Sequence, residues 1–177
     1  MSKITSPGPV ALIAALMARD RFWIDQVKIA LKERFGSIDH QSEIFPFNFS
    51  SYYEKEMGTD LIKQFVSFEG LIEMDRLAEV KILTIKMEED LAEKIGGELR
   101  RRVNIDPGYL SLANLVLATT KNYDHRIYLG RGIFAEVTLR YRHGEFKPLD
   151  WTYPDYRTDL AGEFFKKVRE KLLLSSR

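Results

Sequence analysis

An uninterrupted apolar run near the start of the chain constrains the fold more than any other feature. Residues 10–17 have the sequence VALIAALM, without a single polar side chain. A run of this length, preceded by Pro7, Gly8 and Pro9, is typical of a strand in the middle of a sheet, because both faces of such a strand are covered by other elements. We therefore expect a sheet that is built around residues 10–17.

Three segments carry apolar residues at the spacing of an amphipathic helix. Asp20 is a favourable N-cap for the first, which continues to Gly36, a residue well suited to end a helix. The second begins near Asp75 and is expected to end at the glycine pair 96–97, because its apolar face continues almost to that point. The third is a terminal helix, marked by Phe164, Phe165, Val168 and Leu172.

Alternation of apolar and polar residues predicts further strands. Residues 61–69 alternate clearly, and residues 38–45 have moderate strand character. Residues 125–129 and 133–141 are predicted to form a hairpin, because the glycine-containing segment between them favours a tight turn. Residues 111–120 fit a short helix as well as a strand, so this segment stays unassigned.

Another strand is expected directly before a turn. Alternation from residue 102 to residue 106 places Arg102, Asn104 and Asp106 on one side of this strand. The sequence Asp-Pro-Gly at residues 106–108 then has the signature of a turn, with proline at the second position and glycine at the third. Asp106 would thus lie at the end of a strand.

The order of these elements predicts the fold class. Strand, helix, strand, strand, helix and strand, followed by a hairpin and a closing helix, fit an α+β fold with a ferredoxin-like core. The sheet would be mostly antiparallel with helices on one face, and the alternative is a mixed α/β sheet. Because the sequence has no internal repeat and no linker-like segment, we expect a single domain over residues 1–177.

Composition excludes several classes of protein. The chain has no cysteine, which rules out disulfide frameworks, thiolate nucleophiles and cysteine metal sites. It also has no run of about 18 apolar residues of the kind that spans a membrane, and no segment with the features of a secretory signal. We therefore expect a cytoplasmic protein without a membrane partner.

Positive charge is concentrated in one part of the chain. The net charge is only +1, yet residues 100–147 hold nine Lys and Arg against four Asp and Glu. If this segment folds together, its electrostatic field favours a negatively charged ligand. The alternative is that these cations pair with acidic side chains of the first half, where residues 1–99 hold 12 Lys and Arg against 17 Asp and Glu.

The same segment contains the residues best suited to form a site. Histidine as a residue type suits proton transfer near neutral pH, and His125 is the candidate acid–base catalyst, with Asp106 or Glu136 as its partner. Period-two geometry would place Glu136 and Arg140 on one face of a strand, where arginine can bind an oxyanion with its planar fork. The alternative for this face is a solvated surface with cross-strand ion pairs. The candidate ligand-binding residues are Arg102, Lys121, Arg126, Arg140, Asp155 and Arg157.

The sequence assigns no cofactor. A divalent metal such as Mg²⁺ prefers oxygen ligands, but the candidates are not closely spaced in the sequence. These candidates are Asp106, Asp124, His125 and Glu136. The chain has neither the GxxxxGK[ST] phosphate loop nor the GxGxxG fingerprint, which argues against an ordinary P-loop NTPase or a Rossmann dehydrogenase.

Three functions are compatible with these features. The first is binding or enzymatic turnover of a small anionic ligand, phosphorylated or nucleotide-like, and whether the protein is an enzyme stays open. The second, less favoured, is an RNA- or protein-interaction module that uses the aromatic cluster at residues 45–53. The third is a homodimer formed through a sheet edge or an aromatic patch.

Several motifs spread over nearly the whole chain resemble those of one known family. They are EIFPFNFSSYYEKEMG, VNIDPGYL, LVLATTK, HRIYLGRGIFAEVTLRY and WTYPDYR. Together they are similar to the prokaryotic domain-of-unknown-function family numbered 4416. The resemblance implies a small soluble bacterial or archaeal protein and supplies no activity, cofactor or site residue.

Overall fold

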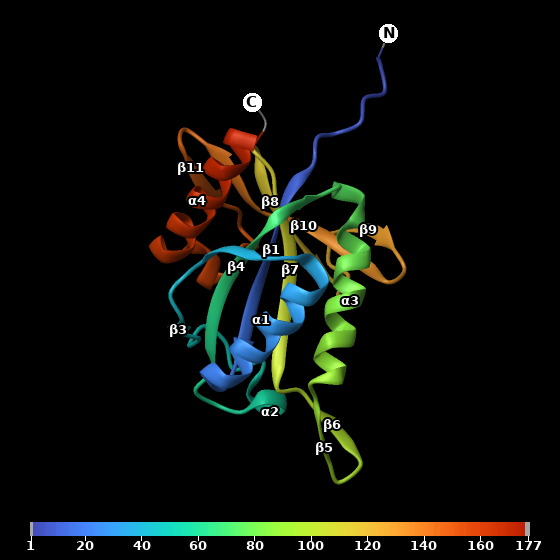
Figure 1. Ribbon diagram of the computed structural model, residues 1–177, viewed down its shortest axis with the longest axis vertical. Coiled ribbons are helices and arrows are strands. Elements are labelled where there is room, and N and C mark those ends of the chain that lie inside the picture. The colour runs from blue at the N-terminus through green and yellow to red at the C-terminus, as the bar shows by residue number, and fades with distance from the viewer. Residues whose placement is uncertain (1, 176–177) are drawn as a thin grey trace.

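One antiparallel sheet of nine strands forms the centre of the molecule (Figure 1). The computed structural model describes residues 2–175, apart from the side chains of residues 55 and 95. The strands of the sheet are β1 (Val10–Ala18), β2 (Ile38–Gln41), β3 (Phe45–Pro46), β4 (Ile62–Ile72), β7 (Val103–Leu110), β8 (Asn114–Thr119), β9 (Ile127–Gly130), β10 (Ile133–Arg142) and β11 (Glu145–Pro148). Their order is β11-β10-β8-β7-β1-β4-β2, with β3 paired to β4 and β9 paired to β10.

Helices and a small hairpin complete the described chain. The helices are α1 (Arg21–Phe35), α2 (Glu54–Met57), α3 (Leu77–Asp90) and α4 (Asp159–Ser175), with 3-10 segments at Met74–Arg76 and Pro154–Arg157. The hairpin pairs β5 (Glu93–Ile95) with β6 (Glu98–Arg100) outside the main sheet. Across residues 2–175, no helix is long and apolar enough to cross a membrane.

The predicted fold class is confirmed. Strands β7-β1-β4-β2 have the order of a ferredoxin-like core, in which the last core strand lies beside the first. Strands β8, β10 and β11 extend the sheet beyond β7. Every strand pair described in this sheet is antiparallel, so the alternative of a mixed sheet is wrong.

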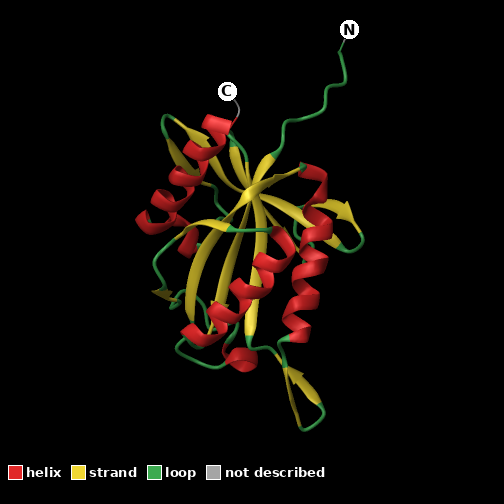
Figure 2. Cartoon of the chain, in the orientation of Figure 1, coloured by secondary structure: helices red, strands yellow, loops and turns green. Residues whose placement is uncertain are grey.

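Both faces of β1 are covered, as its apolar sequence predicts, and all of its residues are buried. The even-numbered residues of β1 pack with α1 and α3 on one face of the sheet. Residues 11, 13 and 15 pack with α4 on the other face. The two helices of the core thus share one face, and the closing helix α4 covers the opposite face; Figure 2 shows the helices packed around the strands.

The helix boundaries agree with the sequence at α1 and differ at α3. The side chain of Asp20 accepts the N–H of Trp23 at 3.1 Å, and Gly36 ends α1 with a φ of 86°. Helix α3 ends at Asp90, so the helix end predicted at residues 96–97 is wrong. Both glycines have positive φ angles and form the turn between β5 and β6, because glycine reaches this region without steric cost.

The predicted hairpin is confirmed as β9 and β10. The segment 111–120, which the sequence leaves unassigned, contains strand β8. Pairing of β8 with both β7 and β10 decides this assignment.

The Asp-Pro-Gly segment lies inside strand β7, so the turn predicted there is wrong. Residues 106–108 pair with residues 13–15 of β1. Pro107 has no N–H to donate. It is tolerated because pairing of β7 with β8 begins only at Gly108, so no carbonyl of β8 lies where it would need an N–H from residue 107. Long-range pairing thus determines the conformation of a segment whose local sequence favours a turn.

Side chains of α3 replace β8 where β8 separates from β7. The backbone N–H of Ile105 donates to Glu88 Oε1 at 2.6 Å, and its carbonyl accepts from Lys81 Nζ at 2.9 Å. Glu88 and Lys81 are both buried. Backbone groups that lose their strand partner are therefore satisfied by two charged side chains.

Gly108 is required by the close approach of β7 and β8. A Cβ atom at this position would lie 2.5 Å from the carbonyl oxygen of Val116 and 2.7 Å from Leu117 Cδ2. We expect Gly108→Ala to lower the free energy of unfolding by roughly 1–3 kcal/mol, because the backbone of β8 would have to move. Urea unfolding measures this loss. Gly162→Ala, in α4 with nothing within 4 Å, is the control and should cause no loss; an equal effect of the two variants would contradict the packing argument.

Glu88 should make stability depend on pH. Burial raises the pKa of Glu88 from 4.5 to about 6, against the opposing charge of Lys81 and the N–H of Ile105. Between these two values the folded state binds more protons than the unfolded state, so the free energy of unfolding falls as pH rises. Glu88→Gln keeps an acceptor for Ile105 and removes this titration.

The unfolding free energy of Glu88→Gln should therefore increase relative to the wild type from pH 4.5 to pH 6 and then stay level. Urea unfolding at a series of pH values measures the difference. Glu89→Gln, on the exposed side of α3, is the matched control. A difference that does not change with pH would show that Glu88 keeps its unfolded pKa.

Candidate functional site

Two rows of side chains on the face covered by α4 form the base of the candidate site. Partners in neighbouring strands lie about 5 Å apart and share a face of the sheet. From β4, β1 and β7, the first row contains Lys63, Met17 and Asn104, and the next contains Phe65, Ala15 and Asp106. Lys63 of β4 and Asp106 of β7 therefore share this face of the sheet, in adjacent rows on either side of β1.

Asp106 is an ionised carboxylate that stays partly accessible. It accepts a hydrogen bond from Asn104 Nδ2 at 2.7 Å and lies 3.5 Å from Lys81 Nζ, and 29% of its side chain is exposed. Burial alone would raise its pKa, but the charges of Lys81 and Lys63 and the hydrogen bonds outweigh burial and lower the pKa below its usual value. Asp106 therefore carries its charge at neutral pH.

A buried ion pair joins β4 to the Pro154–Arg157 segment. Lys63 Nζ lies 2.6 Å from Asp155 Oδ2, and both side chains are almost fully buried. The ammonium also lies 5.1–5.9 Å from the ring centres of three aromatic residues. They are Phe47, Phe65 and Tyr156. Aromatic faces attract a cation, so the rings stabilise Lys63 where water is excluded.

The charge of Asp106 acts on three tyrosines. Burial raises the pKa of Tyr53, Tyr153 and Tyr156, and the negative charge of Asp106 raises each further. Tyr156 is 3% exposed, and its hydroxyl has no hydrogen-bond partner in the described part of the chain. We call the following group the Asp106 cluster: Tyr53, Lys63, Asp106, Tyr153, Asp155 and Tyr156.

Glu136 binds His125 and Arg126, which form a second group of side chains next to the Asp106 cluster. Its Oε2 atom lies 3.1 Å from His125 Nε2 and accepts a hydrogen bond from Arg126 Nε at 2.7 Å. Arg126 also donates to the hydroxyl of Tyr153 at 2.9 Å. Because Glu136 and Asp106 both raise the pKa of Tyr153, this tyrosine links the two groups.

Arg126 is fully engaged in internal contacts. Besides Glu136 and Tyr153, it donates to the backbone carbonyl of Lys121 at 3.0 Å, and its guanidinium lies 4.6 Å from the ring centre of Tyr123. Its side chain is 3% exposed. Arg126 therefore positions its neighbours. The sequence suggests a ligand-binding role for Arg126, but its guanidinium is occupied by contacts within the protein.

His125 is held between two aromatic rings. Its ring centre lies 4.8 Å from that of Trp151 and 6.1 Å from that of Tyr123, with the planes nearly parallel. Nδ1 lies 3.2 Å from Oδ1 of the exposed Asp124. The buried Glu136 at Nε2 and the exposed Asp124 at Nδ1 therefore fix the orientation of the imidazole.

Exposed aromatic side chains gather around these groups. Tyr52, Tyr123, Trp151 and Tyr153 are all exposed, although each contacts a residue named above. Lys121 Nζ lies 3.8 Å from the ring centre of Tyr52, which contacts Tyr53. The Lys121 side chain therefore borders the Asp106 cluster, and its charge is exposed.

The structure brings together most of the residues that the sequence predicts. Those in or beside the Asp106 cluster are Asp106, Lys121, His125, Arg126, Glu136 and Asp155. Arg157 instead donates to three backbone carbonyls of residues 149–152 and holds that loop. Arg102 lies outside strand β7, where it stacks over Trp23 at 4.6 Å and pairs with Glu93 at 2.9 Å.

A β-bulge separates Glu136 from Arg140, so the single charged face predicted for their strand is wrong. Glu136 pairs with Leu117 of β8, but the register then shifts and Arg140 pairs with Asn114. Leu117 and Asn114 point to opposite faces of β8, because side chains alternate along a strand. Arg140 is therefore on the face away from the Asp106 cluster.

Several residues of the site are not predicted from the sequence. Lys63 and Lys81 are buried, and each lies within an otherwise apolar pattern. A lysine at a core position is a usable signal, because a buried charge needs a partner. Tyr53 and Tyr156 carry no such signal, since most aromatic residues belong to the core.

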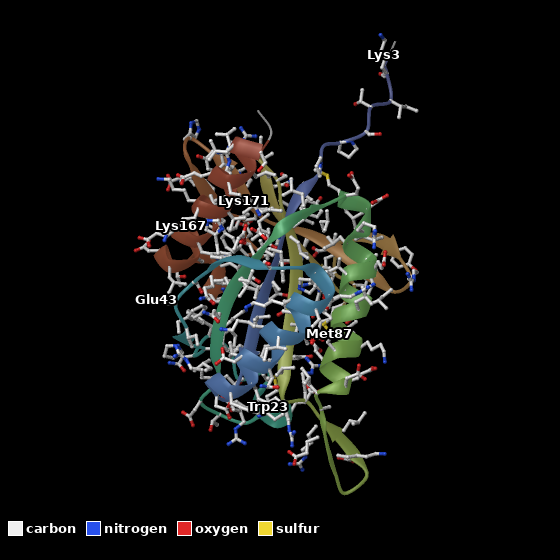
Figure 3. The ribbon with its side chains drawn as sticks, in the orientation of Figure 1. Lys3, Trp23, Glu43, Met87, Lys167 and Lys171 are labelled. Atoms are coloured by element: carbon white, nitrogen blue, oxygen red, sulfur yellow. The ribbon has the colours of Figure 1, made fainter. Side chains whose placement is uncertain are left out.

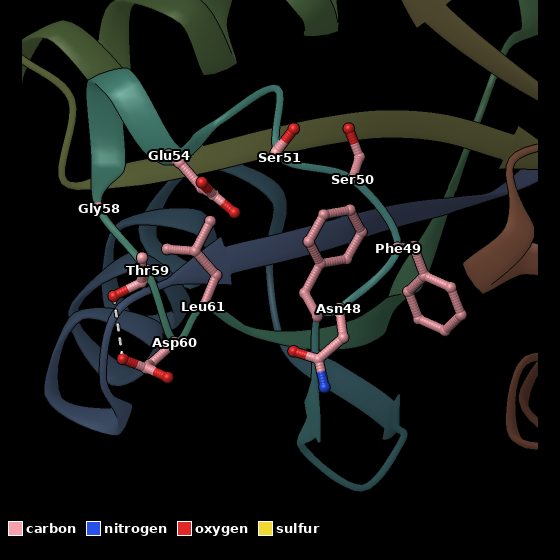
Figure 4. Close-up of a pocket in the computed structure, with 10 residues that line it drawn as sticks. Asn48, Phe49, Ser50, Ser51, Glu54, Gly58, Thr59, Asp60 and Leu61 are labelled. Atoms are coloured by element: carbon pink, nitrogen blue, oxygen red, sulfur yellow. Dashed lines mark hydrogen bonds between the residues drawn. The ribbon is translucent and has the colours of Figure 1, made fainter.

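Three cavities have Asp106 outside their lining, although Tyr156 of the cluster lines one of them. One of about 610 Å³ is lined by four arginines around Trp23, and one of about 510 Å³ lies between β11 and the start of α4. The third, of about 330 Å³, is enclosed by residues 47–61, and Figure 4 shows its polar lining, including the Thr59–Asp60 hydrogen bond. Glu54 and Gly58 line both the first and the third, so these two cavities adjoin.

Within residues 2–175, no three histidine or acidic side chains come together in a way that could hold a metal ion. Asp106, the centre of the cluster, has lysines and an asparagine as its neighbours.

Fold and site together define an α+β protein with an extended ferredoxin-like sheet and a partly accessible, charge-paired cluster on the face covered by α4. The chain belongs to the family described as domain of unknown function (DUF4416), whose model matches residues 8–172. The family resemblance found in the sequence is thereby confirmed. Searches of curated proteins and of solved structures found no match.

The buried pair Lys63–Asp155 should be strongly coupled. We expect Lys63→Met to lower the free energy of unfolding by about 3–5 kcal/mol, because Asp155 would remain buried without a counter-charge. The double variant Lys63→Met/Asp155→Leu should recover part of this loss, since it leaves no unpaired charge. Urea unfolding of both variants tests this, and a double variant that loses as much as the sum of its two single variants would contradict the coupling.

Proposed function

We propose that the Asp106 cluster binds a small anionic ligand of the nucleotide or sugar-phosphate type. The proposal is carried by two observations: Asp106 is ionised and partly accessible, and its charge acts on the buried, unpartnered hydroxyl of Tyr156 and raises the pKa of that tyrosine. A buried polar group without a partner costs free energy. A ligand hydroxyl or amino group that bound Asp106 and Tyr156 would remove that cost.

The exposed aromatic side chains support a ligand that contains a flat ring. Tyr52, Tyr123, Trp151 and Tyr153 present ring faces near the cluster. Stacking of a base on such a face contributes about 1–3 kcal/mol and tolerates different bases. A nucleobase fits this environment better than a purely aliphatic group does.

Lys121 supports the anionic part of the ligand. Its ammonium lies over Tyr52, and its side chain has no ion pair among the described residues. A flexible lysine can follow a phosphate group as a point charge. Arg126 contributes indirectly, because it fixes the backbone of Lys121 and the hydroxyl of Tyr153.

His125 is the residue that we propose for acid–base chemistry on a bound ligand. Glu136 orients its imidazole through Nε2, and the ring stacks on Trp151. A carboxylate–histidine pair is a common arrangement for proton transfer near neutral pH. Asp106 would orient the ligand and not exchange a proton, because its pKa is lowered.

The exposed aromatic residues also favour a second candidate, binding of single-stranded RNA. Such binding should weaken strongly with salt and strengthen with the length of the RNA, because phosphates contribute along the strand. A small-ligand site should bind a mononucleotide as tightly as an oligonucleotide. Fluorescence titration with both, at two salt concentrations, separates the candidates.

The direct test is a titration with nucleoside monophosphates. Trp151 lies beside His125, so Trp23→Phe leaves it as the fluorescent reporter of this site. We expect AMP or GMP to change this fluorescence and raise the melting temperature, since a ligand that binds the folded state stabilises it. Asp106→Asn and Tyr156→Phe should each weaken binding at least tenfold, because each removes a buried hydrogen bond to the ligand.

Asp90→Asn, at the exposed end of α3, is the control and should bind like the parent. Circular dichroism and urea unfolding would verify that the Asp106 variant is folded. Equally tight binding by Asp106→Asn, Tyr156→Phe and Asp90→Asn would show that the Asp106 cluster does not bind the ligand.

A further inference from the structure

The largest of the three cavities lies at the end of the molecule where α2 and the β5–β6 hairpin meet the start of α1 (Figure 1). Trp23, labelled in Figure 3, lies at this end. The cavity has a volume of about 610 Å³, within the range of small-molecule sites. We call it the arginine cavity, because four of its lining residues are Arg19, Arg100, Arg101 and Arg102.

Two of these arginines are occupied by the protein itself. Arg102 pairs with Glu93 at 2.9 Å and stacks over Trp23 at 4.6 Å. Arg101 donates to Asn104 at 2.8 Å and lies 3.4 Å from Glu56. Both guanidinium groups are therefore fixed as walls of the cavity.

The other two arginines are free. Arg19 and Arg100 are exposed, and neither forms an ion pair or a side-chain hydrogen bond anywhere in residues 2–175. Two unpaired guanidinium groups that line one cavity repel each other and gain from an anion between them. Their planar forks suit the oxygen atoms of a phosphate group.

The carboxylates that line the cavity differ in whether they pair with an arginine. Glu93 and Glu56 pair with the occupied arginines, and Asp20 accepts the N–H of Trp23 at the start of α1. Glu54 and Asp20 have no ion pair among the described residues, and the only partner of Asp20 is a backbone N–H. The groups left for a ligand are therefore two guanidinium groups and two carboxylates.

Glu54 faces the place where the arginine cavity adjoins the smaller cavity of Figure 4. Gly58 lies at the same place, and a Cβ atom there would lie 3.4 Å from Arg19 Nε. Its φ of 85° also suits glycine. Gly58 is therefore required by its backbone conformation, and Arg19 lies in van der Waals reach of this position beside α2.

We propose that the arginine cavity is a second binding site, separate from the Asp106 cluster, for a small polyol that carries a phosphate monoester. Arg19 and Arg100 bind the phosphate, because a dianion satisfies both guanidinium groups at once. Glu54 accepts hydrogen bonds from the hydroxyl groups of the polyol, which have no charge to repel it. Trp23 and Arg102 form the wall beside the ligand.

The probe is ribose 5-phosphate, titrated into Trp151→Phe so that Trp23 is the only tryptophan. We expect a saturable change in Trp23 fluorescence that weakens with added salt. A titration of Trp23→Phe with AMP, which reports from Trp151, measures the Asp106 cluster separately. Loss of the Trp151 signal with retention of the Trp23 signal would overturn the proposed function and leave this site intact, and the reverse result would overturn this site alone.

Variants test which residues bind the phosphate and which bind the polyol. Arg19→Gln and Arg100→Gln should each weaken binding at least tenfold, and Glu54→Gln should reduce the preference for ribose 5-phosphate over inorganic phosphate. Arg142→Gln, an exposed arginine on β10, is the control and should bind like the parent. These substitutions are on the surface, and urea unfolding verifies the fold of each.

Two results would overturn the assignment. Equal affinity of Arg142→Gln and the double variant Arg19→Gln/Arg100→Gln would exclude phosphate binding by the free arginines. Equal affinity of the parent for ribose 5-phosphate and inorganic phosphate would exclude the role of Glu54 in binding a polyol.

Discussion

The hydrogen bonds between α3 and the backbone of Ile105 are the interaction on which the candidate site depends. Where β8 separates from β7, Glu88 and Lys81 take over the bonds that a neighbouring strand would make. This arrangement brings the ammonium of Lys81 to within 3.5 Å of Asp106. Asp106 can therefore stay ionised beside a packed core, because a positive charge reaches it through the opening in the sheet.

Two lysines and an asparagine stabilise the charge of Asp106. Lys81 approaches from α3, Lys63 from β4 is shared with Asp155, and Asn104 donates a hydrogen bond. Glu136 and Arg126 form a similar pair next to it and meet the cluster at Tyr153. Such pairing lowers the cost of burying charge and leaves little net charge in this part of the molecule. The arginine cavity differs, because two of its guanidinium groups have no internal partner among the described residues.

Residue type identified candidates in the sequence, whereas strand register decided where they lie. His125 and Glu136, both candidates, contact each other in the structure, and Arg126 joins Glu136 to Tyr153, on which the charge of Asp106 acts. Arg140 could not be excluded from the sequence, because a single β-bulge moves it to the other face of the sheet. The internal role of Arg126 could not be foreseen either, because its partners come from three separate segments.

The sequence by itself determined the central strand, the start and end of α1, the hairpin of β9 and β10 and the order of a ferredoxin-like core. These features follow from local periodicity and from capping residues, which act over a few neighbours along the chain. Only the tertiary structure decided that Asp-Pro-Gly continues a strand, because pairing with β1 outweighs a local turn preference. It also decided which charges remain free, because a partner in space need not be near in sequence.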